Sequence, residues 1–284
     1  MSELSFFKKE HSVYKDEKSN SLKEALEQTT HLGIGAHQDD LEVMASHGIL
    51  NCLGKKDLWF SGVTCTNGAG SARSGKYKSL SDAEMVKVRS EEQVASAKIG
   101  EYSSMIQLGY ESGEVKKESN PMLIDDLKKI ITQSCPAFIY SHNLADKHDT
   151  HIAVVMATIT ALRELDYKPH YFYGCEVWRT LDWLGDHRKV PLEISEDTSL
   201  VSQMIECHHS QIEGGKRYDL AALGRMKSNA TFFESHSVDN AQNLWFAMDL
   251  KPLLEDKSLN PSEFVSKYID EFKKDVCEKV NRFI

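Results

Sequence analysis

The sequence has 284 residues, of which 40% are hydrophobic and 27% are charged, as in an ordinary globular protein. A formal net charge of −9 disfavours nucleic acid as a partner, because surfaces that bind nucleic acid are basic. No apolar run reaches the roughly 18 residues that suggest a membrane span, and the polar N-terminus lacks the apolar core of a secretory signal. Six cysteines lie far apart with no CxxC pair, which predicts reduced thiols. We therefore expect a cytoplasmic protein.

The first predicted elements follow a polar arm over residues 1–28. Residues 31–37 form an apolar run that predicts a short buried strand, and a polar turn closes it. Residues 41–54 carry apolar side chains at helical spacing, with Gly54 as the expected C-terminal cap. A second strand is predicted over residues 58–66, before a loop rich in glycine and serine.

The middle of the chain continues the alternation of helix and strand. A helix is predicted from a cap at Ser81 or Asp82 to about Gly100. Residues 104–110 predict a third strand. Pro121 then introduces a helix over residues 122–134, because proline fits the first turn of a helix.

Two further strands are predicted over residues 137–142 and 170–178, with a helix over residues 150–165 between them. Beyond residue 199 the chain is expected to be mainly helical and irregular, and residues 258–284 contain an amphipathic C-terminal helix. Strands separated by helices of ten or more residues imply βαβ units. The sequence shows no repeat and no long linker, so we predict one α/β domain over residues 1–284, with a mostly parallel sheet flanked by helices.

Two polar clusters directly follow predicted strands. AHQDDLE occupies residues 36–42, after the first strand, and SHNLADKHDTH occupies residues 141–151, after the fourth. Ligands bind beyond the carboxyl ends of the strands of an open parallel sheet. Side chains of the two clusters can therefore converge, although they are about a hundred residues apart.

The two clusters supply a ligand set for a catalytic metal. His37, Asp40 and His151 would give two imidazoles and one carboxylate, which suits Zn²⁺ or Fe²⁺ and leaves a position for water. Asp39 cannot easily ligate from the same turn as Asp40, so it can face that water as the general base. His148 could be a further ligand or a donor to the oxyanion, and we favour the donor because a fourth protein ligand would close the site.

Simpler interpretations exist for each motif alone. An Asp-Asp pair after a strand is usually a helix cap with a solvated carboxylate, and an isolated HxxH is often a surface pair. Their combination at the ends of two strands favours a metal site. Asp149 or Thr150 could cap the following helix or support a ligating imidazole, and Glu42 is expected one turn into its helix as a supporting carboxylate.

The motifs together resemble those of a known family. AHQDDLE is similar to the AHPDDxE signature of the LmbE-like, or PIG-L, family of zinc-dependent N-acetylglucosaminyl deacetylases, and HDTH falls where that family carries HPDH. VTCTNGAG and VRSEEQVASAKIG resemble the loop and the R-x-x-E helix that follow. The resemblance implies a single Rossmann-like α/β domain. It also implies that His37, Asp40 and His151 bind zinc, that Asp39 is the base and that His148 steadies the oxyanion.

The sequence departs from the family pattern at two places. Gln38 replaces a proline, which a turn should tolerate. Asp149-Thr150 replaces Pro-Asp, so the carboxylate that assists the neighbouring histidine in the family is missing at Thr150, and Asp146 or Asp149 could substitute for it.

Other residues could contribute to substrate binding. Arg73 could hold a sugar hydroxyl or a phosphate, although an exposed loop arginine often has no such role. The segment 214–232, which contains Arg217, Tyr218 and Arg225, could cover the site. Pocket-lining roles are also open to His208, His209, His236 and Trp178, for which packing or surface roles are the alternative.

The sequence thus predicts a hydrolase that removes an acetyl or other acyl group from an N-acetylated amino sugar or a related small N-acyl compound. The partners expected are this small molecule and, as a possibility, further copies of the chain. Two alternatives remain open: an Fe²⁺ enzyme of oxygen chemistry with the same two-His, one-carboxylate set, and a metal-containing protein that binds a small molecule without catalysis.

Overall fold

A single sheet organises the fold of the computed structural model, which describes residues 4–118, 120–194 and 198–284. Its strands are β1 (Ser12–Lys15), β2 (His31–Gly35), β3 (Phe60–Thr66), β4 (Ser104–Tyr110), β5 (Phe138–His142), β6 (Tyr171–Cys175), β7 (Lys189–Glu193) and β8 (Leu244–Asp249). They lie in the order β1-β4-β3-β2-β5-β6-β8-β7. The five strands from β4 to β6 are parallel, whereas β1 and β8 run antiparallel to the strands beside them. The predicted α/β class with a mostly parallel sheet is therefore confirmed.

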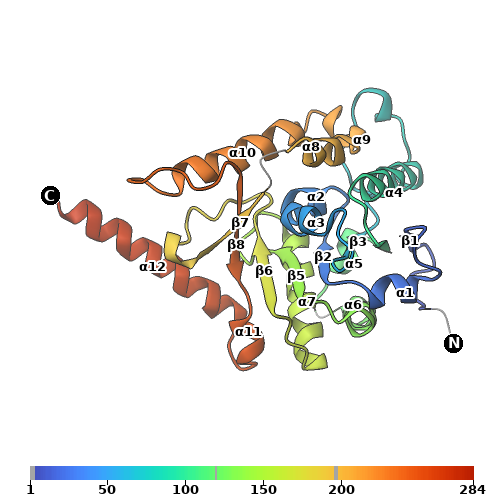
Figure 1. Cartoon of the computed structure of the whole chain (residues 1–284), viewed down its shortest axis with the longest axis horizontal. Coiled ribbons are helices and arrows are strands. Elements are labelled where there is room, and N and C mark those ends of the chain that lie inside the picture. Colours follow the sequence, from blue (N-terminus) through green and yellow to red (C-terminus); the bar gives the residue numbers. More distant parts are fainter. Residues whose placement is uncertain (1–3, 119, 195–197) are drawn as a thin grey trace.

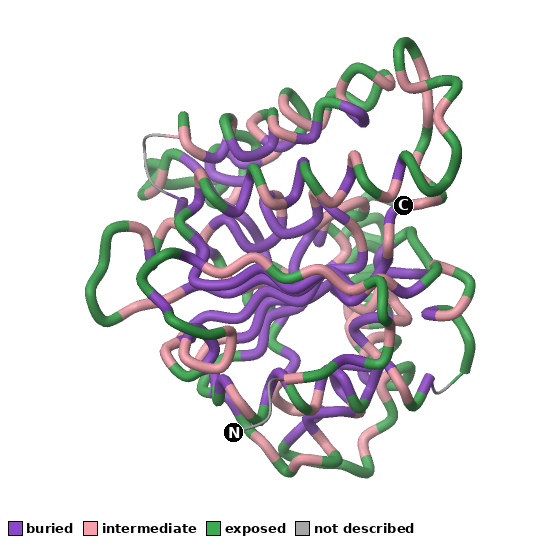
Figure 2. Tube along the Cα trace, turned by 90° about the vertical axis from the view of Figure 1, so that its right-hand side faces the viewer, coloured by how far each residue is buried: buried purple, intermediate pink, exposed green. Residues whose placement is uncertain are grey.

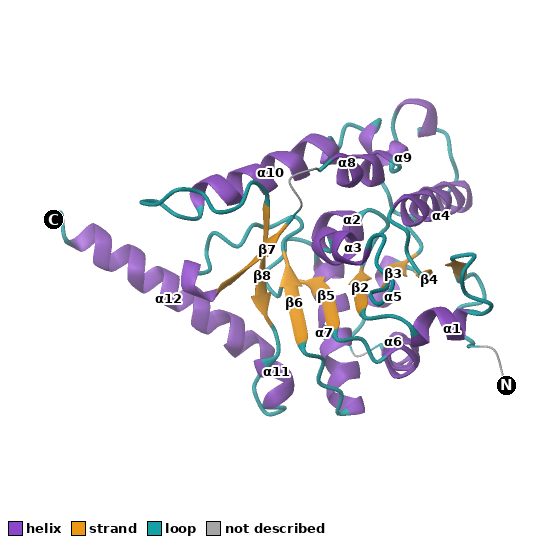
Figure 3. Cartoon of the chain, viewed as in Figure 1, coloured by secondary structure: helices purple, strands orange, loops and turns teal. Residues whose placement is uncertain are grey.

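Helices cover both faces of the sheet (Figure 1). They are α1 (Leu22–Glu27), α2 (Asp40–Met44), α3 (Ser46–Cys52), α4 (Asp82–Ile99), α5 (Ser112–Val115), α6 (Pro121–Ser134), α7 (Asp149–Leu165), α8 (Ser199–Glu206), α9 (His209–Ile212), α10 (Tyr218–Phe232), α11 (Pro252–Glu255) and α12 (Pro261–Asn281). Short 3₁₀ turns lie at Gly75–Tyr77 and Asp186–Arg188. In the view of Figure 3, α2, α3, α4, α8 and α10 lie above the strands, and α6 and α7 lie below them.

Each face of the sheet has its own apolar core. Leu32 and Ile34 of β2 point to the face that packs on α6 and α7. Leu41 and Met44 of α2 belong to the core on the other face, together with residues of α8 and α10. The central strands β2 to β6 are buried along most of their length (Figure 2). Burial on both faces explains why the central strands show no strict alternation of buried and exposed residues.

One glycine brings α2 close to the sheet. A Cβ on Gly33 would lie 2.8 Å from the Phe60 ring and 2.9 Å from a methyl group of Leu41. A larger residue would push α2 outward. The glycine in this strand therefore sets the depth at which the turn after β2 meets the sheet.

Capping explains where two helices begin. The Ser81 side chain accepts from the backbone N–H of Glu84, and the Glu84 carboxylate accepts from the backbone N–H of Ser81. The helix α4 thus starts with a capping box, and its cap is Ser81, one of the two residues predicted. Pro121 is the first residue of α6, and the Asn120 side chain caps it. The helix α4 matters for function because it carries residues that reach the turn after β2.

Several predicted boundaries were wrong. The predicted polar arm over residues 1–28 contains β1 and α1, and β1 pairs with β4. Residues 1–3 of the arm lie outside the described part of the chain. The helix predicted over residues 41–54 breaks at Ala45 into α2 and α3, and it ends at Cys52, before Gly54. The strand β8 lies in the region expected to be helical and irregular. β8 was missed because a short apolar run has no helix–strand signature of its own.

Two broader expectations concern membranes and cysteines. Within the described residues, no helix is both long and apolar enough to cross a membrane. All six cysteines are free thiols.

The topology fixes where a site can form. From β2 the chain moves outward to β3 and β4, and it then returns to place β5 on the other side of β2. The strands β2 and β5 are therefore neighbours at a switch point, and the loops after them diverge to opposite faces of the sheet. Ligands bind at such points in open α/β sheets.

Candidate metal centre and active site

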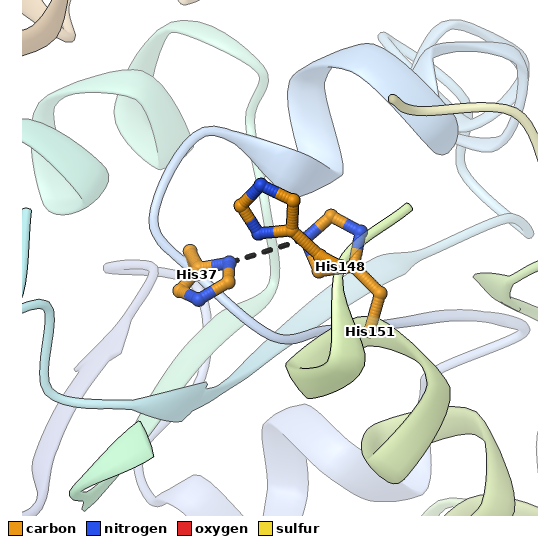
Figure 4. A group of neighbouring side chains, drawn as sticks. All are labelled: His37, His148 and His151. Atoms are coloured by element: carbon orange, nitrogen blue, oxygen red, sulfur yellow. Dashed lines mark hydrogen bonds between the residues drawn. The ribbon is translucent and has the colours of Figure 1, made fainter. Parts of the chain in front are cut away.

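The turn after β2 and the loop after β5 bring the two polar clusters together. His37 lies in the turn, and Asp40 is the first residue of α2. His142 ends β5, His148 is the N-cap of α7, and His151 lies in the first turn of α7. Figure 4 shows His37 and His151 facing each other, with His148 beside them.

The three predicted ligands converge on one point. Nδ1 of His37 lies 3.2 Å from Nε2 of His151 and 3.4 Å from Oδ2 of Asp40. Nε2 of His151 lies 3.4 Å from Oδ1 of Asp40. Two donor atoms that each lie ~2.1 Å from one ion at a tetrahedral angle are about 3.4 Å apart. The His37–His151 contact and the His151–Asp40 contact both have the spacing expected of two ligands of one tetrahedral ion, while His37 approaches the other oxygen of Asp40.

The turn itself fixes the Asp40 carboxylate. Oδ2 accepts from the backbone N–H groups of Ala36, at 3.1 Å, and His37, at 2.7 Å, which leaves Oδ1 free to bind an ion. Burial alone would raise the pKa of Asp40, but the neighbouring His151 and His142 hold that pKa well below its usual value. The carboxylate is therefore charged, as a metal ligand must be.

Asp146 supports His151 from the side away from the other ligands. Its Oδ1 lies 3.3 Å from Nδ1 of His151, so it can accept from that nitrogen and leave Nε2 for an ion. The backbone N–H groups of His148 and Trp178 also donate to this carboxylate. Burial would raise the pKa of Asp146, but the hydrogen bond and charge of His151 lower it to about 2.

His142 was not assigned a role from the sequence. Its Nε2 accepts from the backbone N–H of Ala36 at 3.0 Å and lies 3.4 Å from Oδ2 of Asp40. Its ring stacks on that of His151, with 3.8 Å between ring centroids. Burial lowers the pKa of His142 to about 4, so the ring is neutral. The donor atoms of Asp40, His142 and His151 lie within 4.8 Å of one another, as do those of His37, His148 and His151. Because Nε2 of His142 accepts the Ala36 N–H, His142 supports Asp40 and His151 rather than offering that nitrogen to an ion.

Asp39 is held beside the ligands by α4. Its φ of 96° lies in the left-handed region, which is unusual for a residue other than glycine. The Arg89 guanidinium donates to Oδ2 of Asp39 at 2.8 Å and also to the carbonyl of Gln38. Gln93 accepts from the backbone N–H of Asp39 at 3.2 Å. Burial raises the pKa of Asp39 and the Arg89 charge opposes that rise.

A buried cluster behind Asp39 contains Glu42. This carboxylate accepts from Gln93, Ser96 and Tyr102 at 2.8 to 2.9 Å, and Nε2 of His208 lies 3.3 Å from it. Gln93 thus links Glu42 to the backbone of Asp39. Glu42 therefore supports the turn that carries Asp39 and contacts none of the three predicted metal ligands.

A polar cleft of about 330 Å³ opens at this site. His37, Asp39, Asp40 and His148 line it on one side. The other lining residues are Gly68, Gly70, Ser71, Ala72, Arg89, Ser112, Trp178, Gln211, Lys216 and Tyr218. The segment 214–232 therefore borders the cleft through Lys216 and Tyr218. His148 is exposed and stacks on Trp178, with 5.0 Å between ring centroids.

Other candidates lie away from the cleft. The Arg73 guanidinium donates to the Ala69 carbonyl and pairs with Asp82 at 2.5 Å, and Arg73 is not among the lining residues. Asp149 is exposed and borders a different hollow on α7. His208 is buried against Glu42, whereas His209 and His236 are exposed.

Arg89, Gln93 and His142 were not predicted as site residues. Arg89 and Gln93 lie four residues apart on α4, on the buried side of the helix. A charged residue is rarely buried on a helix unless it has a partner. The sequence does not show that Arg89 is buried, so this signal was not available.

A known protein family matches the part of the chain that contains these residues. Residues 32–162 match the family model of PIG-L, described as GlcNAc-PI de-N-acetylase, and this range contains every residue proposed above as ligand or base. No curated protein matches the sequence.

Solved structures share the fold. The N,N'-diacetylchitobiose deacetylase from Pyrococcus horikoshii superposes with a TM-score of 0.62 at 16% identity, over 80% of this chain and 85% of that one. The conserved protein TT1542 from Thermus thermophilus gives 0.61 at 13% identity, over 82% and 99%. The 4-carboxy-2-hydroxymuconate hydratase GalB from Pseudomonas putida KT2440 gives 0.57 at 18% identity, over 78% and 96%. One fold thus occurs with deacetylase and hydratase activities, so the reaction must be argued from the site.

Proposed function

Because residues 32–162 belong to the PIG-L family, we propose that this chain is a metal-dependent hydrolase that removes an acetyl or other acyl group from an N-acylated amino sugar or a related small N-acyl compound. The observation that carries the proposal is the convergence of His37, Asp40 and His151 at 3.2 to 3.4 Å, with Asp39 beside them. Three protein ligands around an open cleft are the arrangement of a catalytic rather than a structural metal site.

Zinc is the proposed ion, and the imidazoles of His37 and His151 together with the carboxylate of Asp40 would hold it. A divalent ion there supplies Lewis acidity, which lowers the pKa of a water molecule and polarises a carbonyl group. Two imidazoles and one carboxylate also suit Fe²⁺. Elemental analysis after purification without added metal and without oxygen separates the two ions.

Asp39 is the proposed general base. It lines the cleft, and Arg89 and Gln93 hold its carboxylate and backbone in place. During hydrolysis the oxygen of water forms a bond to the carbonyl carbon, and Asp39 takes a proton from that water. The C–N bond then breaks, and the proton passes to the leaving nitrogen, so the products are a carboxylic acid and an amine.

His148 is the proposed donor to the oxygen that gains negative charge. It stands at the open side of the site, where its ring centroid lies 5.9 Å from that of His37. The stack on Trp178 fixes the plane of its ring. A fixed donor at this position stabilises the transition state without having to reorganise.

Substitution of Asp39 tests the role of the base. We expect Asp39→Asn to lower kcat by about 10²- to 10⁴-fold, the range for loss of a general base, while the bound metal measured by elemental analysis stays near one equivalent. The matched control is Asp57→Asn, which changes an exposed loop carboxylate. The assay measures new primary amine from a panel of N-acylated sugars. Full activity of the Asp39 variant would contradict the proposed mechanism.

A further inference from the structure

A second hollow adjoins the polar cleft at Asp39 and Asp40. Its volume is about 140 Å³. The walls are mainly apolar and come from α2, the loop after β6, α10 and β8. The lining residues beyond Asp39 and Asp40 are Val43, Val177, Trp178, Tyr218, Ala221, Ala222, Arg225 and Trp245. We call this space the apolar hollow.

Trp178 and Tyr218 separate the apolar hollow from the polar cleft. Both residues line both spaces, and their rings pack edge to face with centroids 5.8 Å apart. Asp39 and Asp40 also line both spaces. A carbonyl group placed beside these two aspartates is therefore within reach of both spaces.

Arg225, the positively charged residue that lines the apolar hollow, has partners in the wall of the hollow. Arg225 donates to the backbone carbonyl of Val177, and its guanidinium lies over the Trp245 ring at 5.6 Å from the ring centroid. Its charge is thus engaged by the protein, and its stem adds apolar surface. The chemistry of the walls favours an uncharged, apolar occupant.

Besides its oxygen, the carbonyl carbon of an amide carries a nitrogen and an acyl chain, and the two spaces differ in the residue types that line them. Hydroxyl groups of a sugar on the nitrogen side match the polar cleft, where Ser71, Gln211 and Lys216 lie. An alkyl chain on the carbon side matches the apolar hollow. The hollow is larger than a methyl group needs, because an apolar cavity of about 150 Å³ can hold a benzene ring.

On the proposed amide hydrolysis, we infer that the apolar hollow binds the acyl chain and that the preferred acyl group is longer than acetyl, with about six carbons. Val43, Ala222 and Trp245 then determine how long a chain the enzyme accepts. The reaction is unchanged: water adds its oxygen to the carbonyl carbon, and the products are an alkanoic acid and an amine.

A series of N-acylglucosamines with two, four, six and eight acyl carbons tests this inference. The free energy of burying a methylene corresponds to about a fourfold gain in kcat/KM for each added methylene, up to about six carbons. Longer chains should gain nothing further. Equal or higher kcat/KM for the acetyl compound would overturn the inference and leave the proposed hydrolysis standing. If no compound of the series is cleaved by the metal-loaded protein, both fall.

Two variants test whether the hollow is responsible. Ala222→Leu places a larger side chain at its wall and should lower the ratio of kcat/KM for hexanoyl over acetyl substrate at least tenfold. Gly224→Leu is the matched control on the same helix, because a Cβ at Gly224 meets no atom within 4 Å, and it should keep the ratio. If Ala222→Leu does not fold, Val43→Ala serves instead, since it enlarges the hollow and should shift the preferred chain toward eight carbons. An unchanged preference in the folded variants would overturn the inference.

Binding gives a readout that does not depend on turnover. Trp178 and Trp245 both line the hollow, so its occupation should change the intrinsic tryptophan fluorescence. Titration of the metal-loaded protein with hexanoate and with acetate should give a lower Kd for hexanoate, with the fluorescence change lost in Ala222→Leu and kept in Gly224→Leu. Equal affinities for the two carboxylates would count against an acyl-binding hollow.

Discussion

Oδ1 of Asp146 lies 3.3 Å from Nδ1 of His151, on the opposite side of the imidazole from the proposed metal position. The sequence left open which carboxylate compensates for Thr150, and the structure gives this place to Asp146. Asp149, the other candidate, is exposed and borders a different hollow. Of the two candidate carboxylates, only Asp146 thus contacts the His151 ring.

The first prediction concerns this pair. Asp146→Asn should weaken metal affinity by about 10- to 100-fold, because a carboxylate that orients a ligating histidine also raises its basicity. Competition with a chelating dye measures the affinity. Asp149→Asn is the matched control and should bind metal as the unaltered protein does. Equal affinity for the two variants would remove Asp146 from this role.

The second prediction concerns Arg89, whose side chain is 2% exposed. Arg89→Gln removes the charge that holds down the pKa of Asp39, so that pKa should rise further. A general base works only when deprotonated, so the acidic limb of the kcat/KM profile should move to higher pH. The unfolding free energy should also fall by about 3 kcal/mol, because carboxylates are left without their buried partner. Arg188→Gln, at an exposed ion pair, is the control for both measurements.

The third prediction concerns pH and His31, at the start of β2. His31 is 2% exposed and stacks on Phe138 at 4.2 Å, and burial lowers its pKa to about 4. Below pH ~6.5 the unfolded chain therefore binds a proton that the folded protein does not. The unfolding free energy is therefore unaffected by His31 above pH ~6.5. Below that pH it should fall by about 1.4 kcal/mol per pH unit, down to pH ~4.

Urea unfolding between pH 7 and pH 4.5 measures the effect. His31→Phe keeps an aromatic ring against Phe138 and should flatten the decrease in unfolding free energy. His236→Phe, at an exposed position, should not. The same slope in all three proteins would show that His31 titrates equally in the folded and unfolded states.

The fourth prediction concerns removal of the metal. An ion that binds only the folded protein stabilises it by about 2.7 kcal/mol at a free concentration 100 times its Kd. For a domain of this size that corresponds to a shift in Tm of roughly 5 to 10 °C. Chelator should lower the Tm, and added zinc should restore it. His151→Ala should show neither shift, so a zinc-dependent Tm in that variant would place the ion elsewhere.

The main architecture could be predicted from the sequence because its signals are local. Short apolar runs predicted β2 to β6, and the helical spacing of apolar residues between them predicted α4, α6 and α7, all close to their observed bounds. The site could be inferred because polar clusters at the carboxyl ends of parallel strands meet at one edge of the sheet. The family resemblance rested on the same clusters.

What could not be predicted depends on long-range packing. The pairing of β1 with β4, and of β8 with β6 and β7, joins segments that carry no mark of their partners. Arg89 is an arginine on a helix of mixed polarity, and only the fold shows that it turns inward to Asp39. His142 was visible in the sequence, but its stacking on His151 was not.

The proposed ligands and base, and the walls of the apolar hollow, come from different stretches of the chain. The proposed ligands and base lie between residues 37 and 151, whereas, apart from Val43 and the two aspartates, the walls of the apolar hollow come from residues 177–245. On the proposed roles, substitutions in the later stretch away from Trp178, such as at Ala222, would alter which acyl chain is accepted without touching the groups that carry out the chemistry. Such a division would let the preferred acyl chain diverge while the proposed ligands and base stay unchanged.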